Sequence, residues 1–313
     1  MIRYVAGPDW LDPATLLDGG PLASPIPVVA AGLLLMYLAG AIALWSSGRR
    51  WSVPRTLVFA VGCVTLAAVT SGGVETWGGR LFSVFMFQQL TLMIVVPPLL
   101  VLGSPGTLLL RAVPHRGLGR TVLRFAVGAL RSRGARAVLH PAVTIPLFLL
   151  AYYGLYLSEL GDILLASRAG HLAAEAAFLG AGLLFAVPVL SSDPLPVTPS
   201  PFTSVLQMFF ETGVHAFFGV IVMVSPTLLL SAFVETTRAA GLDPLEDQRI
   251  AGGLAWGFGE APTVLVLLWV MHRWFQDDTR RAKAADRRAE VEGDPELDAY
   301  NLYLERLKQG DRG

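Results

Sequence analysis

The chain has 313 residues, of which 53% are hydrophobic and only 15% charged, and its mean hydropathy is +0.56. Soluble domains carry about 25% charged residues, so this chain has too little charge to cover a water-soluble surface of its size. The 24 basic and 24 acidic residues cancel, which leaves no basic excess for binding nucleic acid. The single cysteine, Cys63, excludes an intramolecular disulfide and a cysteine-based zinc site. The composition indicates an integral membrane protein of the lipid bilayer.

Seven long apolar stretches follow one another, each close to the roughly 20 residues that a helix needs to cross a bilayer. We expect an all-α, polytopic bundle of seven transmembrane helices, at residues 25–46, 54–73, 81–103, 138–157, 170–190, 204–228 and 250–273. Barrel strands are excluded because the stretches are too long and lack alternation. The chain then divides into an extracytoplasmic leader (1–24), the bundle (25–274) and a charged cytoplasmic tail (275–313).

The orientation follows from the distribution of lysine and arginine, which gather on the inner side of a membrane. Nineteen of the 24 fall in segments that share one side: 47–55, 104–137, 191–203 and the C-terminal end of the chain from Arg273 onward. The segment 191–203 holds none of them, so it does not contribute to the choice. The bias predicts an N-terminus outside and a C-terminus in the cytoplasm.

Two polar segments have helical patterns of their own. In 104–137, three arginines recur every four residues (Arg116, Arg120 and Arg124), which suits either an amphipathic helix on the inner leaflet or a basic loop that only fixes topology. In the tail, apolar side chains recur at helical spacing (Leu297, Tyr300, Leu304 and Leu307). We expect a short amphipathic helix there, docked on the inner loops or on a partner.

Small residues at four-residue spacing predict the helix faces that pack closely in a membrane. Ala173, Ala177 and Ala181 form one such row in the fifth predicted helix, and Gly253 and Gly257 form a GxxxG in the seventh.

Ionisable residues inside membrane spans are costly and by default suggest function. His171 and Glu175 in the fifth helix, and Glu211 and His215 in the sixth, are i, i+4 pairs, so each pair lies on one helix face. The seventh helix adds Glu260, and the third adds two amides, Gln88 and Gln89. We expect these side chains to converge in one polar pocket, open to the outside, among helices three, five, six and seven. The alternatives are that Glu211 and His215 only satisfy each other, and that the glutamines only join helices by hydrogen bonds.

Four segments resemble the bacterial CtaG proteins, seven-helix factors for cytochrome c oxidase assembly. They begin with FSVFMFQQLTLMIVVPP, HPAVTIPLFLLAYYG, AGHLAAEAAFLGAG and DQRIAGGLAWGFGEAP, and they extend over residues 82–114, 140–160, 169–196 and 247–274. The tail sequence AYNLYL, at residues 299–304, resembles actinobacterial members. The resemblance implies a non-enzymatic membrane factor that contacts oxidase subunits and handles copper for the oxidase on the outer side of the membrane.

The resemblance also implies where a metal site would lie, because the family pattern has histidines in the third helix and an HxxEH in the fifth. Phe85 and Gln89 stand at the two positions in the third helix, and Glu175 stands at the last histidine of the HxxEH, so only His171 remains. Soft Cu(I) prefers Cys, Met and His ligands. Either the metal site has degenerated in this chain, or the ligands are His171 and Glu175 with others supplied from elsewhere, such as His215 and Met86.

Two other functional classes remain open at this point. Paired carboxylates in helices loosened by Gly213 and Pro226 would suit a permease for copper or another small solute. A membrane enzyme has little support, since the chain has no HExxH and no serine-hydrolase motif.

Overall fold

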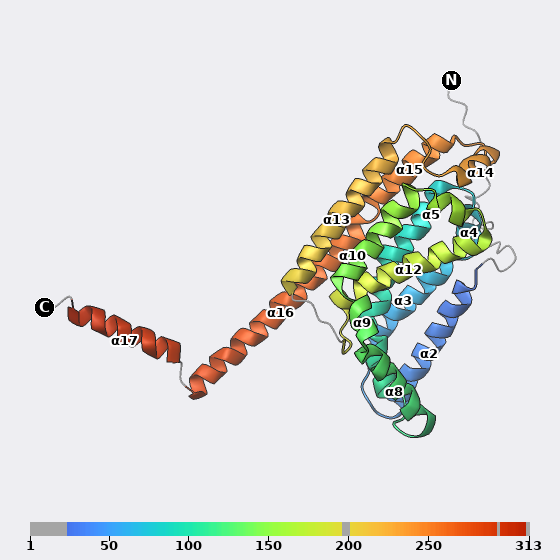
Figure 1. The fold of residues 1–313 in the computed structure, drawn as a ribbon. Helices are drawn as coiled ribbons and strands as arrows, with labels where there is room; N and C mark the ends of the chain where they lie inside the picture. Colours follow the sequence, from blue (N-terminus) through green and yellow to red (C-terminus); the bar gives the residue numbers. More distant parts are fainter. Residues whose placement is uncertain (1–23, 196–200, 293–294, 311–313) are drawn as a thin grey trace. The chain divides into compact units, whose positions relative to one another are not determined.

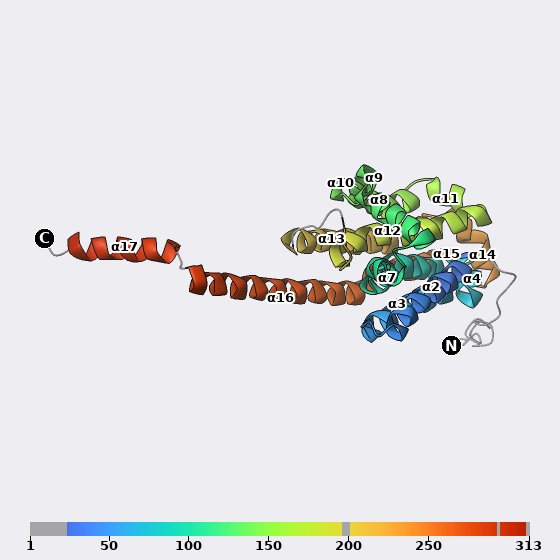
Figure 2. The same cartoon turned by 90° about the horizontal axis from the view of Figure 1, so that it is seen from below.

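The computed structural model describes residues 24–195, 201–292 and 295–310 (Figure 1). All the regular secondary structure over these residues is helical. The chain forms two units, Met1–Leu267 and Leu268–Gly313. The first unit holds most of the helices, and in two perpendicular views they pack side by side as a bundle (Figures 1 and 2). The predicted all-α membrane architecture is therefore confirmed in its class.

The first two predicted helices are α2 (Ile26–Ser46) and α3 (Val53–Val69), which pack against each other. The second ends earlier than predicted. After Val69 the chain bends by 50° into a short helix, α4 (Gly72–Gly78). The bend falls at Gly72, whose φ of 60° lies in the left-handed region that glycine adopts without steric cost. As a result Glu75, which follows the apolar stretch in the sequence, turns back toward the bundle in the first turn of α4.

The third predicted helix is interrupted. It consists of α5 (Phe82–Leu90), a π-helical turn η2 (Thr91–Val95) and α6 (Val96–Leu102), followed by α7 (Pro105–Ala112). Pro97 and Pro98 have no backbone N–H, so they cannot close the usual i to i−4 bonds onto the preceding turn. The widened turn lies where those bonds are missing, a common site for π-helical turns within helices.

Two buried or partly buried aspartates cap helices from distant parts of the chain. Asp247 accepts hydrogen bonds from the first amides of α5, at 2.7 Å from Phe82 N and 3.3 Å from Ser83 N. Asp193 does the same for α7, at 2.9 Å from Gly106 N and 2.7 Å from Thr107 N. Carboxylates at helix N-termini satisfy orphan N–H groups and oppose the helix dipole. These caps tie α5 and α7 to segments more than 80 residues away.

The polar segment after α7 is helical, as one of the two alternatives predicted. It forms α8 (Gly117–Arg131) and α9 (Arg133–Val138). The fourth predicted helix is shorter than expected, with α10 (Pro141–Leu149) continued by a π-helical turn η3 (Leu150–Gly154). A short helix, α11 (Leu160–Leu165), then leads to α12 (Arg168–Leu190), the fifth predicted helix.

The last two predicted helices begin earlier than the apolar stretches suggested. The sixth is α13 (Pro201–Val224). It is followed by η4 (Ser231–Phe233), α14 (Val234–Ala239) and α15 (Pro244–Gly257). The seventh predicted stretch is divided between α15 and α16 (Glu260–Glu292), with a break at Phe258 and Gly259.

Five helices within the described residues are long and apolar enough to cross a membrane, and a sixth is gained if the bent pair α3 and α4 counts as one span. The fourth predicted span corresponds to the apolar helix Pro141–Gly154, which is too short to pass the same criterion. The membrane character is thus supported, while the number seven and the orientation stay predictions.

The close-packing faces differ from those predicted. A Cβ atom at Gly253 or Gly257 would meet nothing within 4 Å, so the GxxxG is not a contact. The close approach of α15 to α13 occurs instead at Gly252, where a Cβ would collide with the backbone of Met223. On α12 a close contact occurs at Gly182, against the backbone of Met93, and of the predicted row Ala181 is buried while Ala173 and Ala177 are exposed. The predicted rows were wrong because small residues are necessary for close contact but do not say which face meets a neighbour.

The second unit contains the end of α16 and α17 (Pro295–Gly310), so the helix predicted in the tail is present. Tyr300 and Leu307 are exposed, and the side chain of Leu297 lies outside the described residues. Docking of this helix stays a prediction.

Candidate functional site

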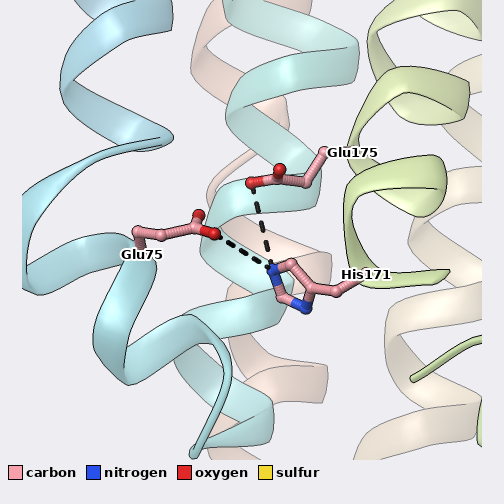
Figure 3. Close-up of side chains that lie close together, drawn as sticks. All are labelled: Glu75, His171 and Glu175. Atoms are coloured by element: carbon pink, nitrogen blue, oxygen red, sulfur yellow. Dashed lines mark ion pairs between the residues drawn. The ribbon is translucent and has the colours of Figure 1, made fainter. Parts of the chain in front are cut away.

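The most concentrated group of polar side chains lies where α4, α5 and α12 meet, and we call Glu75, Gln88, His171 and Glu175 the Gln88 cluster. His171 Nε2 is 4.0 Å from Glu75 Oε1 and 3.9 Å from Glu175 Oε1 (Figure 3). One potential ligand atom from each of these three residues lies within 4.8 Å of the others. Glu175 is 1% exposed, while the side chains of Glu75 and His171 retain 10% and 13% exposure. The cluster is therefore buried at Glu175 and reaches a surface at Glu75 and His171.

Gln88 holds the two carboxylates in place. Its Nε2 donates to Val69 O at 2.9 Å, to Glu75 Oε2 at 3.0 Å, and more weakly to Glu175 Oε1 at 3.5 Å. The amide fits because Gly78 has no side chain, since a Cβ atom there would collide with Gln88 Oε1. An uncharged donor between two carboxylates offsets part of their repulsion and fixes the direction in which their free oxygens point.

The elements that carry the cluster begin at defined caps. The hydroxyl of Ser167 accepts from Gly170 N at 3.0 Å and starts α12 one turn before His171. The Asp247 cap fixes the start of α5, six residues before Gln88. The left-handed Gly72 turns α4 so that Glu75 faces α12. Local turn and cap chemistry thus determines where each side chain of the cluster lies.

Sequence reasoning missed Glu75 because it lies beyond the apolar stretch and was assigned to a connecting loop. The indication that could have found it is the Ser71-Gly72-Gly73 break followed at once by a new helical turn, VETWG. A carboxylate in the first turn of such a helix is both favoured by the dipole and directed toward the preceding helix.

Gln89 belongs to a different network. Tyr156 OH donates to Gln89 Oε1, and Gln89 Nε2 donates to Ala151 O at 3.3 Å. Its remaining contact is with the sulfur of Met93 at 3.7 Å. Gln89 therefore joins α5 to η3 and the residues after it, as in the alternative of hydrogen bonding between helices.

Glu211 and His215 lie apart from the Gln88 cluster. Glu211 lines a cavity of about 30 Å³ between η2, α12 and α13, together with Met93 and Met208. The ring of His215 packs against Tyr152, with ring centroids 5.3 Å apart, and against the backbone at Gly259. Its Nε2 has no hydrogen-bond partner among the described residues, and no ion pair joins His215 to Glu211 there, so the two side chains do not satisfy each other.

The predicted single pocket is therefore wrong. Glu260 is exposed at the start of α16 and does not join the buried groups. His215, predicted as a metal ligand beside His171 and Glu175, lies instead among aromatic rings. Met86 is fully buried, and Cys63 does not belong to the group of potential ligands around His171. The structure brings together only His171, Glu175 and Gln88 of the predicted set, and adds Glu75.

Comparison with known proteins now identifies the family. The sequence model of the cytochrome c oxidase caa3 assembly factor family, CtaG, matches residues 35–277. The chain belongs to this family. The resemblance found in the sequence is thereby confirmed, over a longer stretch than the four segments covered.

The relatives of this CtaG chain include mycobacterial proteins without an assigned role. An uncharacterized protein of Mycobacterium bovis and one of Mycobacterium tuberculosis are each 33% identical over 287 residues, and one of Mycobacterium leprae is 32% identical over 290 residues. These alignments cover 90–91% of this chain but only 43–44% of the relatives, so the chain spans less than half of their length. No solved structure matches the chain.

At Phe85, Gln89 and Glu175 this CtaG chain differs from the histidines that the resemblance implies, and the structure shows what surrounds these residues. Phe85 lies against His171, with ring centroids 5.4 Å apart, and against Phe178 and Phe233 at 5.8 and 5.5 Å. An aromatic wall thus forms one side of the Gln88 cluster. Glu175, at another of the three positions, points into the cluster and supplies a carboxylate. The result is a site of one imidazole, two carboxylates and one amide.

Proposed function

We propose that this protein assists the assembly of cytochrome c oxidase in the bacterial plasma membrane, as a non-enzymatic factor that contacts oxidase subunits. The observation that carries the proposal is the family match, which covers residues 35–277 and so contains the whole Gln88 cluster. The buried polar cluster supports a role beyond packing, because carboxylates in membrane spans are retained at a cost in stability.

The proposed topology has seven crossings, with the N-terminus outside and the C-terminus in the cytoplasm. Five or six long helices support it, and the short helix Pro141–Gly154 with its flanking residues would be the remaining crossing. The single native cysteine makes a direct test simple. In a Cys63→Ser background, a cysteine placed at Gly19 should react with an impermeant maleimide in intact cells, and one at Gly310 only after permeabilisation. The reverse pattern would contradict the orientation.

Copper handling was the finer expectation, and the donor set of the Gln88 cluster does not fit Cu(I). That ion prefers thiolate, thioether and imidazole ligands. Only one of the four cluster residues, His171, offers such a ligand. We therefore propose the assembly role without a copper step at this cluster.

The proposal is tested by deleting the gene from its host and complementing with the chain. The deletion should lower the haem a absorbance and the oxidase activity of isolated membranes, and the complemented strain should recover both. A tagged chain should co-purify with oxidase subunits. Normal oxidase in the deletion strain, or solute flux by the purified chain in proteoliposomes, would contradict the proposal and favour a permease.

A further inference from the structure

The Gln88 cluster has more ligand atoms than the protein itself uses. Glu175 is 1% exposed, and its Oε2 has no hydrogen-bond partner among the described residues. His171 Nε2 is also buried without a hydrogen-bond partner, although it lies between the two carboxylates. Buried polar atoms are nearly always hydrogen-bonded, so two orphaned atoms on neighbouring residues of one cluster call for an explanation such as a bound ion.

The distances around His171 are those of a preformed but open site. At 3.9 and 4.0 Å, the nitrogen is too far from either carboxylate oxygen for a hydrogen bond. Protein ligands bind zinc at about 2.0–2.2 Å, so neighbouring ligand atoms of a tetrahedral ion are roughly 3.3–3.6 Å apart. A contraction of about 0.5 Å would bring the nitrogen to that spacing from each oxygen, and the three ligand atoms already lie within 4.8 Å of one another. Figure 3 shows that the three side chains reach this point from two different helices, α4 and α12.

The charge of the cluster favours a divalent cation as its ligand. Metal ligation would require both carboxyl groups in their ionised form, and two carboxylates with a neutral imidazole carry a charge of −2, which a divalent cation would cancel inside a largely buried site. No lysine or arginine forms an ion pair with Glu75 or Glu175 among the described residues. The donor types, one nitrogen and carboxylate oxygens, suit borderline divalent ions of the Zn²⁺ kind and disfavour Cu(I).

We propose that Glu75, His171 and Glu175 bind a divalent transition-metal ion of the Zn²⁺ type, with the Gln88 amide orienting the two carboxylates. Hydrogen bonds to ligating carboxylates are the usual way in which a protein fixes such ligands. The partial exposure of Glu75 and His171 gives the ion a way in. This site goes beyond the proposed function, because the chain would bind the ion whether or not it acts on the oxidase.

The test uses the full chain, purified in detergent, stripped with a chelator and titrated with ZnCl₂ alone. Metal analysis after desalting should find one zinc per chain, and Co²⁺ in its place should give the visible absorption of a low-coordinate N/O site. Glu75→Gln keeps the size of the side chain and an acceptor for Gln88, and it should weaken zinc binding at least tenfold. Glu175→Gln should do the same.

The matched control is Glu211→Gln, which removes another buried carboxylate outside the cluster and should leave zinc affinity unchanged. Elution from a size-exclusion column and the melting temperature check that each variant is folded. If Glu175→Gln does not fold, His171→Ala takes its place as the second cluster variant. In competition, Cu(I) supplied with a reductant should not displace the zinc. Absence of bound zinc, affinity unchanged in folded Glu75→Gln, or displacement by equimolar Cu(I) would each overturn the proposal.

Discussion

The two glutamate and histidine pairs of this chain have the same i, i+4 spacing but very different surroundings. His171 and Glu175 meet a second carboxylate and an amide from α4 and α5. Glu211 and His215 meet a small cavity and aromatic rings. The pair on α12 lies where three elements present polar side chains to one point, and the pair on α13 does not. Spacing on one helix places two groups on one face, but only neighbouring helices can make that face a site.

The first prediction compares the two surroundings by adding one methyl group to each. Gly78→Ala places a Cβ against Gln88 Oε1, and Gly259→Ala places one against the ring of His215. Overpacking costs about 1–3 kcal/mol. We expect Gly78→Ala to be the more destabilising, because moving Gln88 also breaks hydrogen bonds to Val69 and Glu75.

Thermal melting in detergent measures both variants. Gly253→Ala is the control, since its Cβ would meet nothing within 4 Å, and its free energy of unfolding should change by no more than about 0.5 kcal/mol. A larger loss in Gly259→Ala than in Gly78→Ala would show that hydrogen bonding does not distinguish the two regions.

The second prediction concerns the support of α5, which carries Gln88. Asp247→Ala leaves the amides of Phe82 and Ser83 without their acceptor, and loss of a helix cap costs about 0.5–2 kcal/mol. We expect a loss near the upper end, because Asp247 is 3% exposed and water cannot easily replace it. Hydrogen exchange should rise in the first turn of α5 and stay unchanged in α13.

The control for this prediction is Asp243→Ala, which removes an exposed cap of α15 within its own helix. Its effect should be smaller and should leave exchange in α5 unchanged. Equal protection of α5 in the wild type and in Asp247→Ala would show that the cap does not hold this helix.

The third prediction replaces a histidine in each pair by phenylalanine. His215 already packs on Tyr152 and has an unpartnered Nε2, so His215→Phe removes a buried polar atom that makes no bond. Replacement of an unsatisfied polar group by an apolar one of similar shape is neutral or stabilising, by up to about 1 kcal/mol. His171→Phe should instead destabilise, because a phenyl ring would place an apolar surface against the carboxyl groups of Glu75 and Glu175, which now face a polar imidazole. A melting temperature that falls more in His215→Phe than in His171→Phe would contradict this difference.

The sequence was sufficient for the fold class because long apolar stretches have few alternatives to helices in a bilayer. It was less successful at helix boundaries. The bend after Val69 depends on a left-handed glycine, and the π-helical turn before Val96 depends on two prolines whose effect is local. Hydropathy averages over such features and so returned single uninterrupted helices.

The candidate site was half predictable for a related reason. His171 and Glu175 were found because they are ionisable groups within an apolar stretch. Glu75 was missed because only the bend returns it to the bundle, and Glu260 was wrongly included because hydropathy does not report which way a side chain faces. Convergence of side chains from different helices is a property of the tertiary structure, and it cannot be read from the spacing of residues in one sequence.

The last prediction concerns an exposed ion pair, whose contribution to the free energy of unfolding serves as a reference for both regions. Arg249 and Glu246 are 3.2 Å apart, closer than either contact of His171, but both side chains are more than half exposed. Exposed ion pairs contribute about 0–1 kcal/mol, because water and salt screen the charges and both side chains lose rotamer freedom. Arg249→Ala should therefore change the free energy of unfolding by no more than about 0.5 kcal/mol, and less at 1 M salt. Melting at low and high salt measures this. A loss as large as that of Gly78→Ala would mean that distance matters more than burial in this protein, and would remove the physical basis for treating the Gln88 cluster as exceptional.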